Sequence, residues 1–193
     1  MATSRKLDAR QIHSAIASVV SAISRRHPRA ANLLLLGIAN GGVVLSRRLA
    51  ALLKGEGRLP ASGTLDISFH RDDIGRHPIP KEFAPSSIPQ DVNGATVILV
   101  DDVLHSGRTV KAALDELFDH GRPGRVELAV LVDRGGRRLP VAADYCGLTI
   151  EARESEKVVV HLDEKSPARD SVSIRSAEPR APASRPRPRA LAS

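Results

Sequence analysis

Apolar residues recur at helical spacing near the start of the chain. Between residues 8 and 26 they fall at Ile12, Ala15, Ile16, Val19, Val20 and Ile23, and Pro28 limits any continuation. The pattern predicts an amphipathic first helix. Further helices are predicted at residues 43–55, which Gly55 closes, and at residues 108–121.

Short apolar runs alternate with these helices. Buried strands are predicted at residues 32–38, 96–100 and 125–133, further strands at 63–73 and 158–162, and a short edge strand at 171–174. Strands that alternate with helices are typical of βαβ units. The predicted fold class is therefore α/β, with a mostly parallel central sheet flanked by helices.

Two stretches lack this periodicity. Residues 74–90 are rich in proline, and we interpret them as a long mobile loop of the kind that is often functional. Residues 176–193 have the proline and arginine content of a disordered tail. A chain of 193 residues suits one globular domain. We therefore expect a single domain over residues 1–175, followed by the tail.

Composition and charge narrow the classes of function. The net charge is +7, but residues 166–193 hold six arginines and two acids and so carry +4 of it, which leaves +3 for residues 1–165. Aromatic residues make up only 2% of the chain, which argues against a surface that stacks on several bases. The single cysteine, Cys146, excludes an internal disulfide and suits a reducing compartment. A polar N-terminus without long apolar runs predicts a cytoplasmic protein outside membranes.

Candidate chemistry is concentrated in residues 97–110, VILVDDVLHSGRTV. Ligands of parallel sheets bind at the carboxyl ends of strands, so Asp101 and Asp102 should lie at that edge. A strand-to-helix loop follows, with backbone N–H groups, hydroxyls, a guanidinium and a helix N-terminus, as a phosphate site requires. The two acids would then hold sugar hydroxyls or Mg²⁺ through water. In the alternative interpretation, the acid pair caps a helix and the SGRT segment is an ordinary loop. This alternative accounts less well for the complete sequence of residues 97–110.

The segment VILVDDVLHSGRT resembles the thirteen-residue phosphoribosyl pyrophosphate (PRPP) motif of type I phosphoribosyltransferases. Surrounding stretches, among them LDISFHRDD, DELFDHGRPGRVELAVLVDRGGRRLP and SEKVVVHLDE, resemble the pyrimidine operon regulator (PyrR) family over residues 7–174. The resemblance implies the type I phosphoribosyltransferase fold with a mobile active-site loop. It also implies a pentosyltransferase that converts uracil and PRPP to UMP and pyrophosphate with Mg²⁺. Another base specificity stays open.

The resemblance also implies roles for individual residues. Asp101 and Asp102 would hold the ribose hydroxyls, and with Asp72 the metal, while Arg71 would meet the pyrophosphate. The 5′-phosphate would bind at His105, Ser106, Gly107, Arg108 and Thr109. The pyrophosphate loop would be Ala39, Asn40, Gly41 and Gly42, where this chain lacks the basic residue that family members commonly carry. Small residues there still permit backbone N–H contacts.

The uracil base is expected near Val132, Asp133 and Arg134, with Tyr145 and Cys146. Tyr145 would pack on the ring or, alternatively, belong to the core. His105 has the side chain of an acid or base but is interpreted as a loop residue.

The family also binds the pyrimidine operon leader RNA when a uridine nucleotide is bound, and the resemblance implies a homodimer or larger homo-oligomer. This chain departs from the family's RNA contacts at Ala17, Ser18, Ser21 and Gly136. RNA regulation with weak or no catalysis is therefore an alternative to the enzyme hypothesis.

Overall fold

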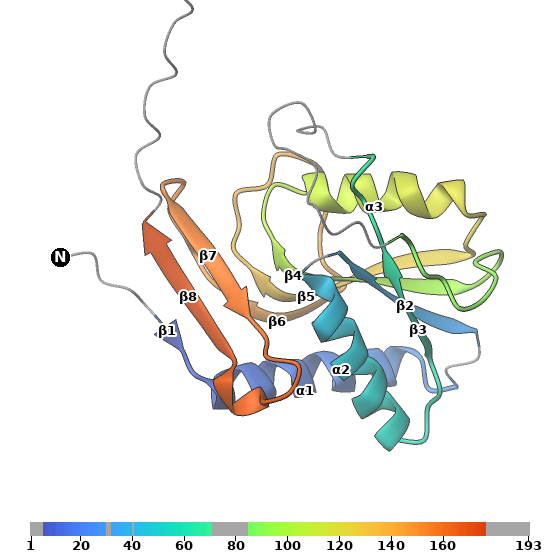
Figure 1. Cartoon of the computed structure of the whole chain (residues 1–193), viewed down its shortest axis with the longest axis horizontal. Coiled ribbons are helices and arrows are strands. Elements are labelled where there is room, and N and C mark those ends of the chain that lie inside the picture. Colours follow the sequence, from blue (N-terminus) through green and yellow to red (C-terminus); the bar gives the residue numbers. More distant parts are fainter. Residues whose placement is uncertain (1–5, 30–31, 40, 71–84, 177–193) are drawn as a thin grey trace, which may run out of the picture.

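Two sheets organise the part of the chain that the structure describes (Figure 1). The structure is a computed structural model and describes residues 6–29, 32–39, 41–70 and 85–176. In chain order the elements are β1 (Lys6–Leu7), α1 (Ala9–Arg26), β2 (Leu33–Ile38), α2 (Gly42–Gly55), β3 (Ala61–Leu65), β4 (Thr96–Leu104), α3 (Arg108–Asp119), β5 (Arg125–Asp133), β6 (Tyr145–Thr149), β7 (Glu156–His161), the 3-10 turn η1 (Pro167–Arg169) and β8 (Ser171–Ser176).

The larger sheet is fully parallel, in the order β3-β2-β4-β5-β6, which confirms the predicted fold class. Alternate strand residues bury on opposite faces: Leu33 and Leu35 pack in the core formed with α1 and α2, whereas Leu34 and Leu36 pack in the core formed with α3. Figure 1 shows α3 on one side of this sheet and the other two helices on the opposite side. Because both faces are covered, the central strands are continuous apolar runs rather than alternating ones.

The smaller sheet is antiparallel, in the order β1-β8-β7. The prediction of an edge strand at residues 171–174 is therefore wrong, because β8 lies between β7 and the two-residue β1 from the start of the chain. The five-residue β6 was not predicted at all. It is the outer strand of the larger sheet, and its sequence, YCGLT, has a glycine and an exposed cysteine in place of an apolar run.

The third strand is shorter than predicted. β3 ends at Leu65 because Asp66 turns the chain: its Oδ1 accepts hydrogen bonds from the backbone N–H and the hydroxyl of Ser68, at 2.9 and 2.6 Å. Of the predicted mobile loop, residues 74–84 lie outside the described residues, as does the predicted tail from residue 177 onward.

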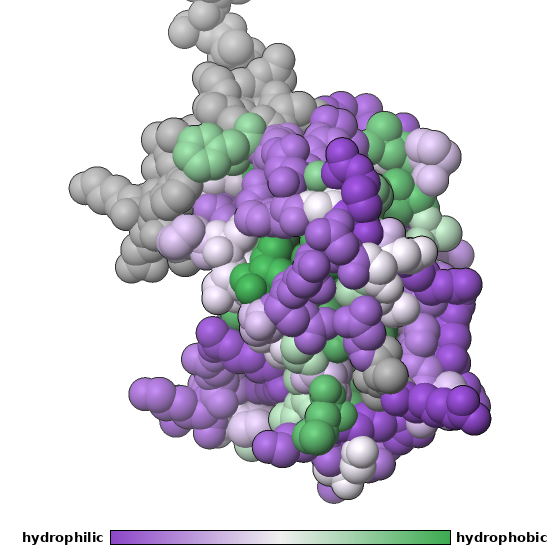
Figure 2. Space-filling model, turned by 90° about the vertical axis from the view of Figure 1, so that its right-hand side faces the viewer, coloured by the Kyte–Doolittle hydropathy of each residue, from purple (hydrophilic) through white to green (hydrophobic). Residues whose placement is uncertain are grey.

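The surface carries few large apolar side chains among the described residues. Those that are exposed are Leu52, Leu59, Phe69 and Phe118. The face drawn in Figure 2 is largely hydrophilic, with hydrophobic side chains in separate small patches. No helix in the described part of the chain has both the length and the apolarity to cross a membrane.

One buried carboxylate fastens the loop before β8 to the two helices beneath it. Asp170, 3% exposed, accepts hydrogen bonds from Arg48 of α2, with Nη2 at 3.1 Å from Oδ1, and from the backbone N–H of Asp163 at 2.9 Å. His13 of α1 places its Nε2 3.2 Å from the other oxygen, Oδ2. This side chain therefore ties the smaller sheet to the helices, in addition to the apolar packing of Val158, Val172 and Ile174 in the core formed with α1 and α2.

Replacing Asp170 with alanine should lower the free energy of unfolding by about 3 kcal/mol, because the half-buried Arg48 guanidinium loses its carboxylate. Urea denaturation measures this change. The matched control is Glu164→Ala, which removes the partner of Arg47 from an exposed pair and should cost less than about 1 kcal/mol. Equal losses in the two variants would contradict the role assigned to Asp170.

Candidate active site

The acidic pair lies inside β4 rather than after it. The strand continues to Leu104 because β5 pairs with it as far as Asp133, so that Asp101 lies opposite Val130. The neighbouring β2 pairs Gly37 with Val100 and ends at Ile38. The loop that follows β2 therefore begins at the level of the two acids, at the carboxyl edge of the sheet.

Two glycines allow this loop to lie directly against β4. A Cβ on Gly41 would be 2.5 Å from Cγ of Asp102, and one on Gly42 would be 1.9 Å from the carbonyl oxygen of Val100. At Gly42 the neighbouring atoms are backbone, which leaves no room for a Cβ, whereas a side chain at position 41 would require the carboxylate of Asp102 to move. Helix α2 begins at Gly42 with neither a side-chain cap nor an acid in its first turn. Its open N–H groups and the positive end of its dipole therefore lie beside Asp102.

The two carboxylates are costly to ionise in this environment. Burial, and then the charge of Asp102, raise the pKa of Asp101 from 3.8 to about 8. Burial likewise raises the pKa of Asp102. The backbone N–H of Asp102 donates to Oδ1 of Asp101 at 3.0 Å, which offsets only part of this cost. The pair is therefore suited to a ligand that brings hydroxyl donors or a cation.

The predicted phosphate loop lies next to the acids along the same strand. Gly107 has a φ of 90°, a conformation that favours glycine, and α3 starts immediately after it. The backbone N–H of Arg108 is 3.4 Å from the hydroxyl of Ser106. Arg108 and Thr109 are exposed at the first turn of α3, which contains no acid. The positive end of the helix dipole at this turn thus favours an anion.

The loop after β5 supports the phosphate loop. The guanidinium of Arg137 donates to the carbonyl oxygen of His105 at 2.7 Å and is paired with the carboxylate of Asp133. Two backbone N–H groups, of Arg138 and Leu139, donate to the carbonyl oxygen of Ser106 at 3.0 Å. The sequence pattern assigns no role to Arg137. The structure uses it to hold the loop in place.

The side chain of His105 lies against the loop that follows β5. Its pKa is lowered by burial and then by the charges of Arg134, Arg138 and Arg137. A Cβ on Gly136 would be 2.9 Å from its Nε2. The neighbouring positive charges disfavour the imidazolium, which agrees with its interpretation as a loop residue.

The predicted base-binding residues divide into two groups. Val132 and Asp133 end β5 at the same edge as the acids, and Arg134 follows directly. Tyr145 does not join them. It pairs with Ala129, four residues before Asp133, so it lies about 13 Å further back along the sheet.

Tyr145 is 3% exposed within the apolar core, and its hydroxyl donates to Glu127 at 2.6 Å. Of the two interpretations left open for this residue, the structure supports the core position. Cys146 pairs with Val130, which also pairs with Asp101, so it lies level with the acids but two strands away from them, and it is exposed. The remaining predicted site residues, Asn40, Arg71 and Asp72, lie outside the described residues.

A cavity of about 480 Å³ beside this edge was missed by sequence reasoning. It lies between the end of β6 and the smaller sheet, and its lining is mostly apolar: Leu7, Leu148, Thr149, Ile150, Glu151, Val172 and Ile174. The backbone N–H of Ile150 donates to the carbonyl oxygen of Asp133 at 2.8 Å, which connects the cavity to the end of β5. No signal along the chain indicates it, since its walls come from three distant segments.

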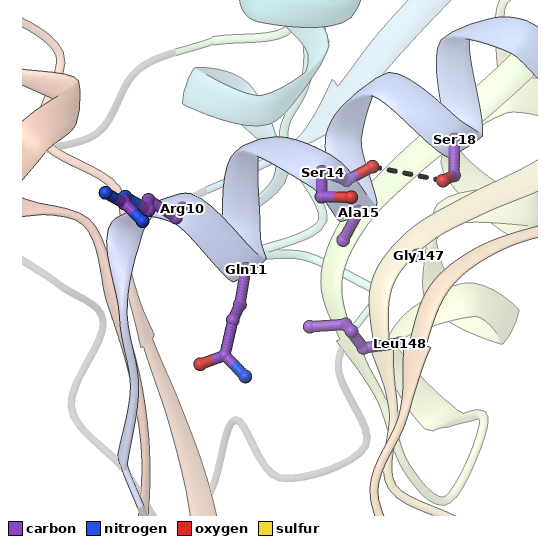
Figure 3. A pocket seen from close by; sticks show the side chains of 7 residues that line it. All are labelled: Arg10, Gln11, Ser14, Ala15, Ser18, Gly147 and Leu148. Atoms are coloured by element: carbon purple, nitrogen blue, oxygen red, sulfur yellow. Dashed lines mark hydrogen bonds between the residues drawn. The ribbon is translucent and has the colours of Figure 1, made fainter.

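A second hollow, of about 430 Å³, lies on the outer face of α1 (Figure 3). It is lined by Arg10, Gln11, Ser14, Ala15 and Ser18 of α1 and by Gly147 and Leu148 of β6. The hydroxyl of Ser18 donates to the carbonyl oxygen of Ser14 at 3.0 Å. Ala17 and Ser21 are exposed on the same helix. Ala17, Ser18 and Ser21 are positions at which this chain departs from the RNA contacts of the resembled family, and Arg10 is the only charged residue in the lining.

Comparison with known proteins identifies relatives over most of the chain. The family model described as phosphoribosyl transferase domain matches residues 6–166. The bifunctional protein PyrR of Roseiflexus sp. (strain RS-1) is 44% identical over 170 residues, which cover 87% of this chain and 92% of that protein. The bifunctional protein PyrR of Bacillus subtilis (strain 168) is 43% identical over 161 residues, which cover 82% of this chain and 89% of that protein.

Solved structures share the fold at lower identity. The hypoxanthine phosphoribosyltransferase of Trypanosoma cruzi has a TM-score of 0.64 and 20% identity, and the match covers 88% of this chain and 94% of that one. A hypoxanthine-guanine phosphoribosyltransferase from Bacillus anthracis has a TM-score of 0.59 and 20% identity, over 76% and 84% of the two chains. The expectation of the phosphoribosyltransferase fold is confirmed.

Replacing Gly42 with alanine should lower the free energy of unfolding by about 1–3 kcal/mol and weaken PRPP binding, because the new methyl group meets the β4 backbone. Urea denaturation and calorimetric titration with PRPP measure the two effects. At the other end of the same helix, Gly55→Ala meets nothing within 4 Å and should be neutral or stabilising by up to about 1 kcal/mol. Unchanged PRPP affinity in a folded Gly42→Ala protein would refute the proposed contact between this loop and the ligand.

Proposed function

The chain belongs to the PyrR family of phosphoribosyltransferases, and we propose that it transfers the phosphoribosyl group of PRPP to uracil, forming UMP and pyrophosphate. The observation that carries this proposal is the desolvated pair Asp101 and Asp102, adjacent to an open helix N-terminus on each side, at the starts of α2 and α3. A ligand with hydroxyls flanked by phosphates matches that arrangement of groups.

The ribose of PRPP would lie on the acidic pair. Burial raises the pKa of these carboxylates because their ionised form loses water, and ligand groups that donate hydrogen bonds stabilise that form. The 2′- and 3′-hydroxyls of the ribose are such donors. The 5′-phosphate would then bind residues 106–109 at the start of α3, where the positive end of the helix dipole favours an anion.

The pyrophosphate would bind the loop of Ala39, Asn40, Gly41 and Gly42. Without a basic side chain in this loop, its attraction for an anion comes from backbone N–H groups and the dipole of α2. Arg71 is assigned to the pyrophosphate by family resemblance. We expect a lower affinity for pyrophosphate than a loop with lysine or arginine would give.

Mg²⁺ suits the donor set of this site. Asp101 and Asp102 supply carboxylate oxygens, which are the ligands that Mg²⁺ prefers, and a cation would relieve the repulsion that raises the pKa of Asp101. Asp72 is assigned to the same ion through water. When bound, Mg²⁺ would neutralise charge on the departing pyrophosphate.

In the proposed reaction, a ring nitrogen of uracil attacks C1 of PRPP while the bond from C1 to the pyrophosphate oxygen breaks, and the proton of that nitrogen is released. The protein holds the two reactants in line and stabilises the charge that develops on the leaving group. In this proposal, backbone groups at Val132, Asp133 and Arg134 would meet the polar edge of the base. No covalent intermediate is required.

Release of pyrophosphate from PRPP should occur with uracil and be much slower with hypoxanthine, guanine and orotate, as a coupled pyrophosphate assay would measure. Asp102→Asn should reduce kcat/KM with uracil by about 10- to 100-fold, since it removes a charged hydrogen-bond acceptor. Asp115→Asn, on the exposed side of α3, is the matched control and should leave kcat/KM unchanged. Absence of turnover with uracil at millimolar PRPP would refute the proposed activity.

A second candidate function is UMP-dependent binding of the pyrimidine operon leader RNA. The observation that favours it is a sequence identity of 42–45% to several proteins named bifunctional protein PyrR. On α1, the positive charges available for this task are Arg10, in the lining of the hollow described above, and Arg25 and Arg26 in the last turn. Family resemblance also leads us to propose a homodimer or larger homo-oligomer, which sedimentation would measure.

If this second function operates, the leader hairpin should bind more tightly than its reverse complement, and UMP should increase that preference. Filter-binding titrations with each RNA, with and without UMP and at two salt concentrations, measure it. Purely electrostatic binding would be equal for both RNAs and would weaken steeply with salt. That outcome would rule out hairpin-specific regulation.

A further inference from the structure

Three potential metal ligands, His70, Glu116 and Asp119, meet at the C-terminal end of α3, outside the candidate active site, and His120 lies beside them. The Nε2 atom of His70 lies 3.2 Å from Oε2 of Glu116 and 3.3 Å from Oδ2 of Asp119. On the other side of the same glutamate, Nε2 of His120 lies 3.0 Å from Oε1. One ligand atom each from His70, Glu116 and Asp119 lies within 4.8 Å of the other two. The cluster thus joins the segment after β3 to the end of a helix.

We propose that this cluster binds a transition-metal ion such as Zn²⁺. In a tetrahedral site with bonds of about 2.0–2.1 Å, neighbouring ligand atoms are separated by about 3.3–3.4 Å. The two distances from His70 are close to that separation. Imidazole combined with carboxylate favours Zn²⁺, Co²⁺ or Ni²⁺ over Mg²⁺, which prefers oxygen ligands alone.

The local structure assembles these ligands on one face. Glu116, Asp119 and His120 follow the i, i+3, i+4 spacing that places side chains together on a helix. The helix ends at Asp119, so the negative end of its dipole lies at the cluster and favours a cation there.

A hydrogen-bonded serine fixes the orientation of the central ligand. The hydroxyl of Ser86 donates to Oε1 of Glu116 at 2.6 Å and accepts from the backbone N–H of Asp66 at 2.9 Å. Metal-binding carboxylates are commonly oriented by such partners. The side chains of His70 and Glu116 are 25% and 16% exposed, and that of Asp119 is 71% exposed, so an ion can enter from solvent.

A bound ion would crosslink two parts of the scaffold that meet beside the active site. His70 lies four residues after Asp66, and Leu65, at the end of β3, accepts a hydrogen bond from the backbone N–H of Ala39 at 3.0 Å. Ala39 opens the proposed pyrophosphate loop. The ion would therefore stiffen the surroundings of that loop without touching PRPP. The proposal does not depend on the identity of the transferred base.

The test uses the full chain without a histidine tag, stripped of metal by a chelator and kept in millimolar Mg²⁺ to saturate the acidic pair. Titration with Co²⁺ should give the visible absorption of a tetrahedral ion at one equivalent, and calorimetry with Zn²⁺ should give one site per chain. His70→Gln and Glu116→Gln should each weaken Zn²⁺ binding by about 10- to 100-fold. His161→Gln, which removes a histidine on β7, is the matched control and should bind as the wild type does.

Thermal unfolding separates loss of the site from loss of the fold. Zn²⁺ should raise the unfolding midpoint of the wild type and of His161→Gln, because the ion binds the folded state. It should not raise the midpoint of His70→Gln, whose far-UV circular dichroism should match that of the wild type. If the four side chains form only an ion-pair cluster, Zn²⁺ will not shift the wild-type midpoint, and the proposal fails. It also fails if all variants bind Zn²⁺ equally.

Discussion

The close approach of the start of α2 to the end of β4 is the constraint on which the candidate site depends. Gly41 and Gly42 let the helix begin against the backbone of Val100 and the carboxylate of Asp102. Water is thereby removed from two acids whose repulsion is not relieved by any cation of the described residues. The positive end of the helix lies beside them. A sugar with hydroxyl groups between two phosphate groups would match this arrangement, because the hydroxyls would donate to the acids and the phosphates would lie at the helix N-termini.

The scaffold around the site is held by buried carboxylates paired with arginine and histidine. Asp170 fastens the smaller sheet to α1 and α2. Glu127, 2% exposed, accepts hydrogen bonds from Tyr145 and His27, and these outweigh burial, so that its pKa is lowered. Burial and this carboxylate in turn raise the pKa of Tyr145. These groups lie away from the candidate site, so they contribute to the frame rather than to the proposed chemistry.

The loop after β5 positions the predicted phosphate loop through hydrogen bonds. Arg137 bonds to the carbonyl oxygen of His105 and to Asp133, while two backbone N–H groups of the same loop hold Ser106. The phosphate loop is therefore positioned by residues about thirty places later in the chain. In this chain, Arg137 can therefore affect the candidate site through the loop that it holds.

The sequence by itself determined the α/β class, the three helices, the central strands and the PRPP motif, because apolar periodicity and the order of acids, hydroxyls and glycine are properties of neighbouring residues. It misjudged β6 and β8, whose pairing depends on distant segments, and the end of β4, which β5 extends. The residues next to Tyr145 in the chain do not predict its position in the core. Its partner Glu127 lies on β5 and comes close only because β5 and β6 pair in the sheet. The tertiary structure alone decided that Arg137 supports the phosphate loop and that His70 meets α3, because those contacts join residues far apart in sequence.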